Sequence, residues 1–114
     1  MKVTKSSKTK KTVLWKELEL ADNLIAHTKG IMFRKKIDKP MLFIFSNEQP
    51  VSIHSFFCIP FDIIYMDKFG KVINILYQVQ PSNVLPKVKC KYILECRAGD
   101  ARKKKIKMGD KLIF

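Results

Sequence analysis

Apolar and polar residues alternate along several short stretches of the chain, as they do in strands that bury one face. The clearest alternation is in residues 71–80 (KVINILYQVQ). Residues 61–66 (FDIIYM) are also β-patterned, and the two runs flank a turn over residues 67–70 that ends in Gly70. Two β-patterned runs joined by such a turn predict a hairpin. In the second run, the alternation predicts that four apolar side chains share one face: Ile73, Ile75, Tyr77 and Val79.

Other β-patterned runs predict further strands, over residues 12–20, 41–45, 51–58, 90–97 and 111–114. The run at 41–45 (MLFIF) does not alternate, which is typical of a strand buried on both faces. In the strand at 90–97, we expect the side chains of Tyr92, Leu94 and Cys96 to share a face.

Two short helices complete the predicted elements. Asp22 is a suitable N-cap and Gly30 a suitable C-terminus for a helix over residues 22–30. Asp100 can cap a second helix of one or two turns that ends at Lys105. Gly99 and Gly109, like Gly70, are interpreted as turn glycines. Because no parallel βαβ rhythm is present, the predicted fold is mainly β, an antiparallel β sandwich or jelly-roll-like barrel with two short helices.

Charge adds a second feature, because the 114 residues carry 23 Lys and Arg against 10 Asp and Glu, a net charge of +13. Residues 1–11 contain five lysines and no acid, which predicts a disordered basic tail before a single compact β domain over residues 12–114. Another basic cluster lies near the C-terminus: Arg102, Lys103, Lys104, Lys105 and Lys107. Such a charge favours anionic partners, although solubility and a lysine-rich proteome explain it equally well. The abundance of lysine and isoleucine and the scarcity of glutamine fit a thermophile.

The three cysteines, Cys58, Cys90 and Cys96, form no C-x-x-C pair. Cys90 and Cys96 fall in one predicted strand, on the same face and about 20 Å apart, too far to bond. We therefore expect a reducing compartment in which cysteines pack as small hydrophobes. No run approaches the ~20 apolar residues of a membrane span and no signal peptide is evident, so we expect a cytoplasmic protein. No metal and no cofactor are expected, and the sequence leaves the oligomeric state open.

Several fragments occur in a family-specific order: GIMFR at residues 30–34, PFD at 60–62, LECRAG at 94–99 and GD at 109–110. Over about residues 14–114 the chain resembles the family called domain of unknown function number 192, whose motifs are G-L-M-F-R, P-L/I-D, L-E-x-x-A-G and a closing G-D. The resemblance implies a compact, jelly-roll-like β sandwich and no settled biochemical activity. Many relatives carry Trp-Met-Lys-Asn-Thr or His-Thr-x-x-Met ahead of the P-x-D motif, where this chain has HSFFC at 54–58. Any role of that Lys, Asn or Thr is therefore not expected here.

Asp62 and Arg34 are the first candidate functional residues. An acid inside an apolar strand is costly unless it is paired, and Arg34 follows three apolar residues. We expect the two to form a partly buried bidentate pair, which either binds a polar ligand or bridges the helix to the sheet. Glu95 is expected to pair with Lys91 or Arg97.

His54 is the third candidate. It is flanked by serines, but no G-x-S-x-G elbow supports a catalytic triad. The histidine is therefore interpreted as a semi-buried, hydrogen-bonded residue or as a ligand-facing group. The spacing of His54, Asp62 and Glu95 does not favour a metal site.

Two functions follow from these residues. The first is a non-enzymatic binding module for a small polar or carbohydrate-like ligand near Arg34, His54 and Asp62. The second is association with nucleic acid through the basic tail and the cluster at 102–107. An aromatic base-stacking platform would support the second function, although core packing explains the same residues: Phe56, Phe57, Phe61, Tyr65 and Tyr77. An enzyme is not expected, because no P-loop, metal box or paired acid–base motif is present.

Overall fold

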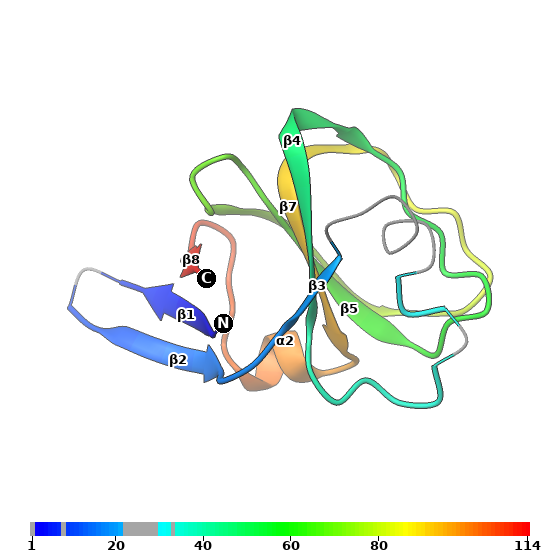
Figure 1. Cartoon of the computed structure of the whole chain (residues 1–114), viewed down its shortest axis with the longest axis horizontal. Coiled ribbons are helices and arrows are strands. Elements are labelled where there is room, and N and C mark those ends of the chain that lie inside the picture. Colours follow the sequence, from blue (N-terminus) through cyan, green and yellow to red (C-terminus); the bar gives the residue numbers. More distant parts are fainter. Residues whose placement is uncertain (1, 8, 22–29, 33) are drawn as a thin grey trace.

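A computed structural model describes residues 2–7, 9–21, 30–32 and 34–114, which form two β-sheets and one short helix (Figure 1). The three-stranded sheet has the order β2-β1-β8, and its strands are β1 (Val3–Ser6), β2 (Lys11–Trp15) and β8 (Lys111–Ile113). The five-stranded sheet has the order β3-β4-β7-β5-β6, and its strands are β3 (Glu19–Ala21), β4 (Met41–Val51), β5 (Phe61–Met66), β6 (Val72–Val79) and β7 (Val88–Arg97). All neighbours are antiparallel except β3 and β4, which are parallel. The predicted mainly β class is confirmed, with two open sheets and no closed barrel.

The predicted hairpin is confirmed as β5 and β6. Its turn is held by Asp67, whose Oδ1 accepts the backbone N–H groups of Phe69 at 2.8 Å and Lys71 at 3.0 Å. The predicted alternation of the second strand is wrong, because the pairing of β5 and β6 shifts register twice. Each bulge turns the following residues to the other face. As a result, Ile75 packs on one face of the sheet, whereas Ile73 and Val79 pack on the other.

The boundaries of the other strands and helices differ from the predicted ones. The run at 12–20 divides into β2 and β3, which belong to different sheets. The strand predicted at 41–45 continues to Val51, and residues 52–58 of the strand predicted at 51–58 form a loop in which His54 makes one isolated bridge to Val84. The helix expected at 22–30 falls almost wholly outside the described residues. The second helix is confirmed as α2 (Asp100–Lys103), although Gly99 with φ +93° is its N-cap rather than Asp100.

The N-terminal residues also depart from expectation, because Val3–Ser6 form a strand where a disordered tail was predicted. This strand pairs with both β2 and β8, and Val3 is completely buried. Lys5 points its ammonium group to the surface, where Nζ donates a 2.9 Å hydrogen bond to the carbonyl of Lys105. A lysine-rich segment can therefore form the central strand of a sheet, because Val3 is buried while the lysine ammonium groups reach solvent.

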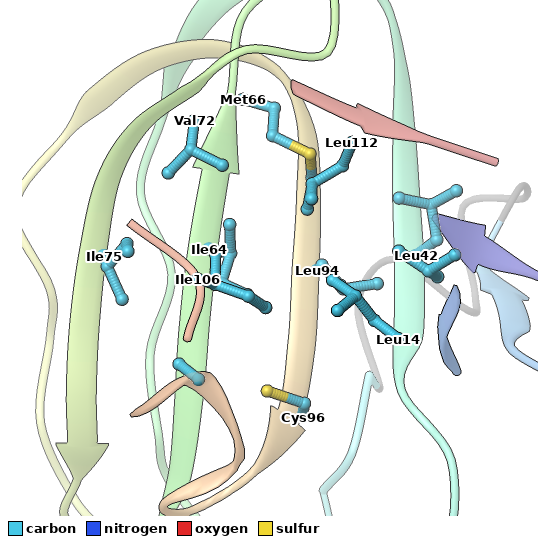
Figure 2. Close-up of a cluster of buried hydrophobic side chains, with 12 residues drawn as sticks. Leu14, Leu42, Ile64, Met66, Val72, Ile75, Leu94, Cys96, Ile106 and Leu112 are labelled. Atoms are coloured by element: carbon cyan, nitrogen blue, oxygen red, sulfur yellow. The ribbon is translucent and has the colours of Figure 1, made fainter. Parts of the chain in front are cut away.

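The five-stranded sheet buries both of its faces. One face packs against the three-stranded sheet and α2, and we call this packed layer the sandwich core. Figure 2 shows its side chains: Leu14, Leu42, Ile64, Met66, Val72, Ile75, Leu94, Cys96, Ile106 and Leu112. The opposite face, here called the loop-covered face, packs against residues 30–32, 34–37 and 52–60, and its core includes Phe43, Phe61, Ile63, Tyr65 and Ile93.

The cysteine geometry corrects one prediction. Cys96 lies in the sandwich core and Cys90 on the loop-covered face, so the two do not share a face. The change of face coincides with a shift in the pairing of β4 with β7, where Tyr92 lies opposite Ile44 but Cys90 lies opposite Gln49. The expected shared side of Tyr92, Leu94 and Cys96 is confirmed, since all three contribute to the sandwich core. In the described part of the chain, no helix is long and apolar enough to span a membrane.

Candidate functional site

A cavity of about 280 Å³ lies on the loop-covered face. It is lined by a turn at residues 30–32, by β4 and β7, and by the loop that follows β4. Most of its lining side chains are apolar: Ile31, Met32, Phe43, Phe45, Val51, Ile53 and Cys58. The polar lining residues among those described are Ser52, His54 and Glu95.

Gly30 allows the turn to pass close to the sheet. Its φ is +51°, and a Cβ placed on it would lie 3.2 Å from Cζ of Phe43 and 3.6 Å from Oε1 of Glu95. Left-handed backbone favours glycine, and the contact with Phe43 leaves little room for a side chain. The glycine therefore brings the Phe43 ring and the Glu95 carboxyl group together at one wall of the cavity.

The loop over residues 52–58 is fixed in place by Ser55, which is completely buried. The Ser55 hydroxyl donates to the carbonyl of Gln80 at 2.6 Å and accepts the N–H of Asn83 at 2.8 Å. These bonds replace strand pairing and satisfy polar groups that would otherwise be buried without partners. They hold His54 and Cys58 on either side of Ser55 at the cavity wall.

His54 is held by its own loop. Its Nδ1 accepts the backbone N–H of Phe56 at 3.2 Å, and its ring lies 5.3 Å from the Phe56 ring. Because Nδ1 acts as an acceptor, the neutral imidazole carries its proton on Nε2. This agrees with the expected hydrogen-bonded, semi-buried histidine, and the cavity wall also satisfies the ligand-facing alternative geometrically.

Glu95 is the most unusual residue of the cavity. It is only 3% exposed, and its cross-strand neighbours are Met41 and Ile63. Burial raises the pKa of its carboxyl group to about 8. Within the described residues, no side chain or backbone group donates a hydrogen bond to this carboxyl group or forms an ion pair with it. An acid buried in this way is a functional candidate, because the described residues do not compensate its desolvation.

The partners predicted for Glu95 are engaged elsewhere. Lys91 places its ammonium group 5.6 Å from the ring centroid of Tyr92, and Arg97 lies 3.7 Å from the carboxylate of Asp100. The predicted ion pair of Glu95 with Lys91 or Arg97 is therefore wrong. Residues 91 and 97 flank Glu95 along β7, but neither side chain reaches into the cavity lining.

Cys58 lies in the same lining. Burial and, secondarily, the charge of Glu95 raise the pKa of its thiol to about 11. A thiol in this state is protonated at neutral pH and is a poor nucleophile.

The predicted pair of Arg34 with Asp62 is wrong, because Arg34 binds Glu19 instead. The guanidinium donates from Nη1 to Oε1 at 3.0 Å and from Nη2 to Oε2 at 2.6 Å. This bidentate contact lowers the pKa of Glu19 and raises that of Arg34. The geometry expected for Arg34 is thus present, but with a different acid at the start of β3.

Asp62 instead binds backbone groups on the sandwich side of β5. Its Oδ1 accepts the N–H of Gln78 at 2.7 Å, and its Oδ2 accepts those of Gly99 at 3.0 Å and Ala101 at 2.9 Å. The alternation of β5 turns this side chain away from the loop-covered face, so Asp62 and His54 are not brought together. The three expected ligand-binding residues are therefore distributed over three places, and only His54 lines the cavity.

No metal centre forms in the described residues, where no three His, Cys, Asp or Glu side chains lie close enough to hold an ion. His54 and Glu95 share the cavity, but Asp62 lies on the other face of the sheet.

The C-terminal basic cluster is partly occupied by structural contacts. The Arg102 guanidinium lies 4.3 Å from the ring centroid of Tyr77. Lys104 lies 4.8 Å from that of Trp15 and donates a 2.7 Å hydrogen bond to the carbonyl of Leu14. Four members of the cluster are exposed: Arg102, Lys103, Lys105 and Lys107. The suggested aromatic platform does not form, because Phe61 and Tyr65 are completely buried.

Glu95 was not among the candidate ligand-binding residues predicted from the sequence. The same signal that drew attention to Asp62, an acid within an apolar strand, is present in the run Tyr92 to Cys96. Asp62 meets three backbone donors, whereas Glu95 meets none among the described residues. Pattern alone does not separate these cases, since the donors come from bulged or turning backbone elsewhere in the chain.

Fold and cavity together describe a class: small β-sandwich domains with a cavity of about 280 Å³ beside the larger sheet. Residues 3–114 match the family described as an uncharacterised ACR, the domain of unknown function 192, and the chain belongs to that family. A UPF0127 protein of Pyrococcus horikoshii is 32% identical over 107 residues, which cover 90% of this chain and 91% of that protein. A UPF0127 protein of Pyrococcus abyssi is 31% identical over 90% of each chain.

Two crystal structures share the fold. A protein of unknown function from Novosphingobium aromaticivorans aligns with a TM-score of 0.86 and 28% identity, covering 100% of this chain and 84% of that one. A protein from Sinorhizobium meliloti, described as a putative transcription regulator, aligns with a TM-score of 0.83 and 24% identity, covering 98% and 91%. The resemblance inferred from the sequence fragments is thus confirmed for the family and for the fold.

Proposed function

We propose that this chain is a non-enzymatic binding module and that a small molecule occupies the cavity on the loop-covered face. The observation that carries the proposal is Glu95, a carboxyl group that is 3% exposed and has no described hydrogen-bond partner, set in the lining of a mostly apolar cavity. Binding sites for small molecules combine apolar walls with a few polar groups in this manner.

The lining narrows the kind of ligand. A volume of about 280 Å³ suits a molecule at or below the small end of typical ligand pockets, which span about 300–1,000 Å³. A carbohydrate presents hydroxyl groups on every side, and walls such as Phe43, Phe45 and Ile53 cannot hydrogen-bond to them. The favoured ligand therefore has an apolar body and a single polar head group that reaches Glu95 or His54.

The chemistry of the lining favours binding over catalysis. Glu95 has a pKa in the range of a general acid or base, but the nearby thiol of Cys58, with a pKa of about 11, is a poor nucleophile. Asp62, which might have completed an acid–base pair, accepts three backbone hydrogen bonds on the other face of the sheet. We include a cytoplasmic location in the proposal, supported by the three buried free cysteines.

The proposal is tested by amide chemical-shift mapping with four small probes: benzyl alcohol, benzamide, benzoate and benzylammonium. At least one should shift the amides of Gly30, Ile53 and Glu95 while leaving β1 and β8 unchanged. Ile53→Trp should fill the cavity and abolish these shifts. Val84→Trp is the matched control, because Val84 is 69% exposed and is not part of the lining. Shifts that persist in Ile53→Trp, or that never appear with any probe, would contradict the proposal.

A second candidate function is association with nucleic acid, favoured by the four exposed basic side chains around α2. Each phosphate contact contributes to the salt dependence of binding, so four contacts give a log–log slope of up to about −4. Replacing Arg102, Lys103, Lys105 and Lys107 by glutamine should remove that slope. If the wild-type protein fails to shift RNA or DNA at low salt, this candidate is excluded.

A further inference from the structure

We infer that the cavity binds an organic amine whose ammonium group contacts the Glu95 carboxylate and whose hydrocarbon body packs against the apolar walls. The inference rests on the proposed function, because it assigns a chemical class to the ligand of the same cavity. It is carried by the geometry around one side chain and by the charges of the residues that line the site.

The first observation is that no described residue donates a hydrogen bond to the carboxyl group of Glu95, which lines the cavity. A carboxylate accepts hydrogen bonds on both oxygens, and the described residues supply no donor to either. An ammonium group carries three donors and no acceptor, so it complements this group in both hydrogen bonding and charge. An uncharged ligand with a single hydroxyl would leave most of that capacity unfilled.

The second observation is the charge of the lining. The chain carries 23 Lys and Arg residues, yet none of them is among the described residues that line the cavity. An anionic ligand would face the Glu95 carboxyl group without a compensating cation from these residues. The described lining of the cavity thus contains an acid and no Lys or Arg, although the whole chain is basic, and this favours a cationic ligand.

The third observation is the position of Phe43. Its Cζ and the Oε1 of Glu95 both lie within 4 Å of one point beside Gly30, the position that a Cβ on that glycine would occupy. A cation that touches the carboxylate from this side also approaches the aromatic ring. Aromatic rings attract ammonium groups within about 6 Å of the ring centroid. Because Gly30 has no side chain, the Phe43 ring and the Glu95 carboxyl group lie close together at this wall of the cavity.

Binding of an amine requires a proton balance. With a pKa of about 8, Glu95 is protonated at pH 7 in the empty cavity. The ionic contact forms when the carboxyl proton leaves to solvent, so the cation binds with release of about one proton at pH 7. The apparent affinity should therefore rise about tenfold per pH unit below pH 8 and level off above it.

Few other titratable groups face Glu95 in the described structure. The electrostatic neighbours are Cys58, Tyr65 and Cys96, and burial raises the pKa of each, so all three stay neutral at pH 7. His54 shares the cavity lining. A His54→Gln variant separates its contribution from that of Glu95.

The experiment compares three probes that differ only in the head group on a phenyl-terminated chain: 2-phenylethylammonium, 2-phenylethanol and 3-phenylpropionate. Calorimetric titration of the full chain at pH 6, 7 and 9 should show the ammonium compound binding most tightly, with affinity rising about tenfold from pH 6 to pH 7. Glu95→Gln should weaken it about tenfold to a hundredfold, the effect of losing a charged hydrogen-bond partner. Glu17→Gln, which removes an exposed acid paired with Lys39, is the control and should leave binding unchanged.

Each other outcome overturns the inference. Preferential binding of the alcohol or the carboxylate, weakening as the pH rises through 8, would mean that protonated Glu95 acts as a donor; the cavity would still be a binding site and the proposed function would stand. Equal binding of the ammonium compound to wild type and Glu95→Gln would remove Glu95 from recognition. If none of the three probes binds, the amine is excluded, and the shift mapping with Ile53→Trp judges the proposed function separately. The pH series uses wild type alone, so it stands even if Glu95→Gln fails to fold.

Discussion

The backbone N–H of Ala101 donates a 2.9 Å hydrogen bond to Oδ2 of Asp62, which ties helix α2 to strand β5. The same oxygen accepts the N–H of Gly99 at 3.0 Å, at the N-cap of the helix. The other carboxylate oxygen accepts the N–H of Gln78, whose positive φ of 49° marks the bulge in β6. The buried carboxylate of Asp62 thus connects β5 both to the start of helix α2 and to the bulge of β6.

Replacing this acid should be strongly destabilising. Asp62→Ala leaves three backbone donors without their acceptor, and we expect a loss of about 3–5 kcal/mol in the free energy of unfolding. Urea denaturation of both proteins at pH 7 measures the difference. Asp38→Ala, which removes an acid that is 71% exposed, is the control and should change stability by less than about 0.5 kcal/mol. A change of less than about 1 kcal/mol in Asp62→Ala would show that water replaces its contacts.

The ion pair of Arg34 and Glu19 should matter far less, because both side chains are about one-third exposed. Arg34→Gln should cost about 0.5–1 kcal/mol at neutral pH. The pair lowers the pKa of Glu19 below its ordinary value of 4.5, so its contribution is present above pH 4.5 and is lost as the pH falls through the lowered value. The stabilities of wild type and Arg34→Gln should therefore converge in acid. A difference that is unchanged at low pH would show that Arg34 acts through packing alone.

Glu95 should give the opposite pH dependence. Its pKa is about 8 in the folded chain and 4.5 in the ordinary, solvated state, so the unfolded chain loses this proton first. The stability of wild type relative to Glu95→Gln should be greatest below pH 4.5. It should fall by up to about 1.4 kcal/mol per pH unit as the pH rises toward 8, then become constant. Thermal melts of both proteins from pH 4 to 9 measure this; a flat difference would show that the carboxyl group is hydrated.

Two glycines with similar backbone angles should respond differently to alanine. Gly70 has φ +80°, and an added Cβ would lie 2.6 Å from the carbonyl oxygen of Leu112. Gly109 has φ +88°, and an added Cβ would meet no atom within 4 Å. We expect Gly109→Ala to cost about 1 kcal/mol from backbone strain, and Gly70→Ala clearly more, because the contact displaces β8. Equal losses in urea denaturation would mean that the hairpin turn moves freely away from β8.

The sequence predicts those parts of the fold in which local pattern and long-range packing agree. The hairpin of β5 and β6, the strand β7 and the single-turn helix at Asp100 were all anticipated within a few residues. The N-terminal strand was not predicted, because a segment with five lysines has the composition of a disordered tail. Its conformation is determined by pairing with two neighbouring strands, β2 and β8. The run at 51–58 contains residues that favour strands, yet Ser55 fixes it as a loop by binding residues 80–83.

The candidate site was predicted only in part, for a related reason. Of the three candidate ligand-binding residues, His54 lines the cavity, whereas Arg34 and Asp62 were assigned to each other because both need a polar partner. The sequence indicates that each of these two charged residues needs a polar partner, but it does not show which partner lies nearby in the fold. Glu19 and the backbone of α2 supply the contacts, and both are brought in by sheet order rather than by local spacing.

Leu94 and Glu95 are adjacent in β7, but the first lies in the sandwich core and the second lines the cavity. A slip of one residue in the pairing of β7 would exchange their environments, because every side chain of a slipped strand changes face. The carboxyl group would then enter a layer filled by Ile64, Leu42 and Leu112. Misregistered pairing is thereby penalised through desolvation of an acid, so the same residue proposed to recognise a ligand also selects the correct alignment of the central strand during folding.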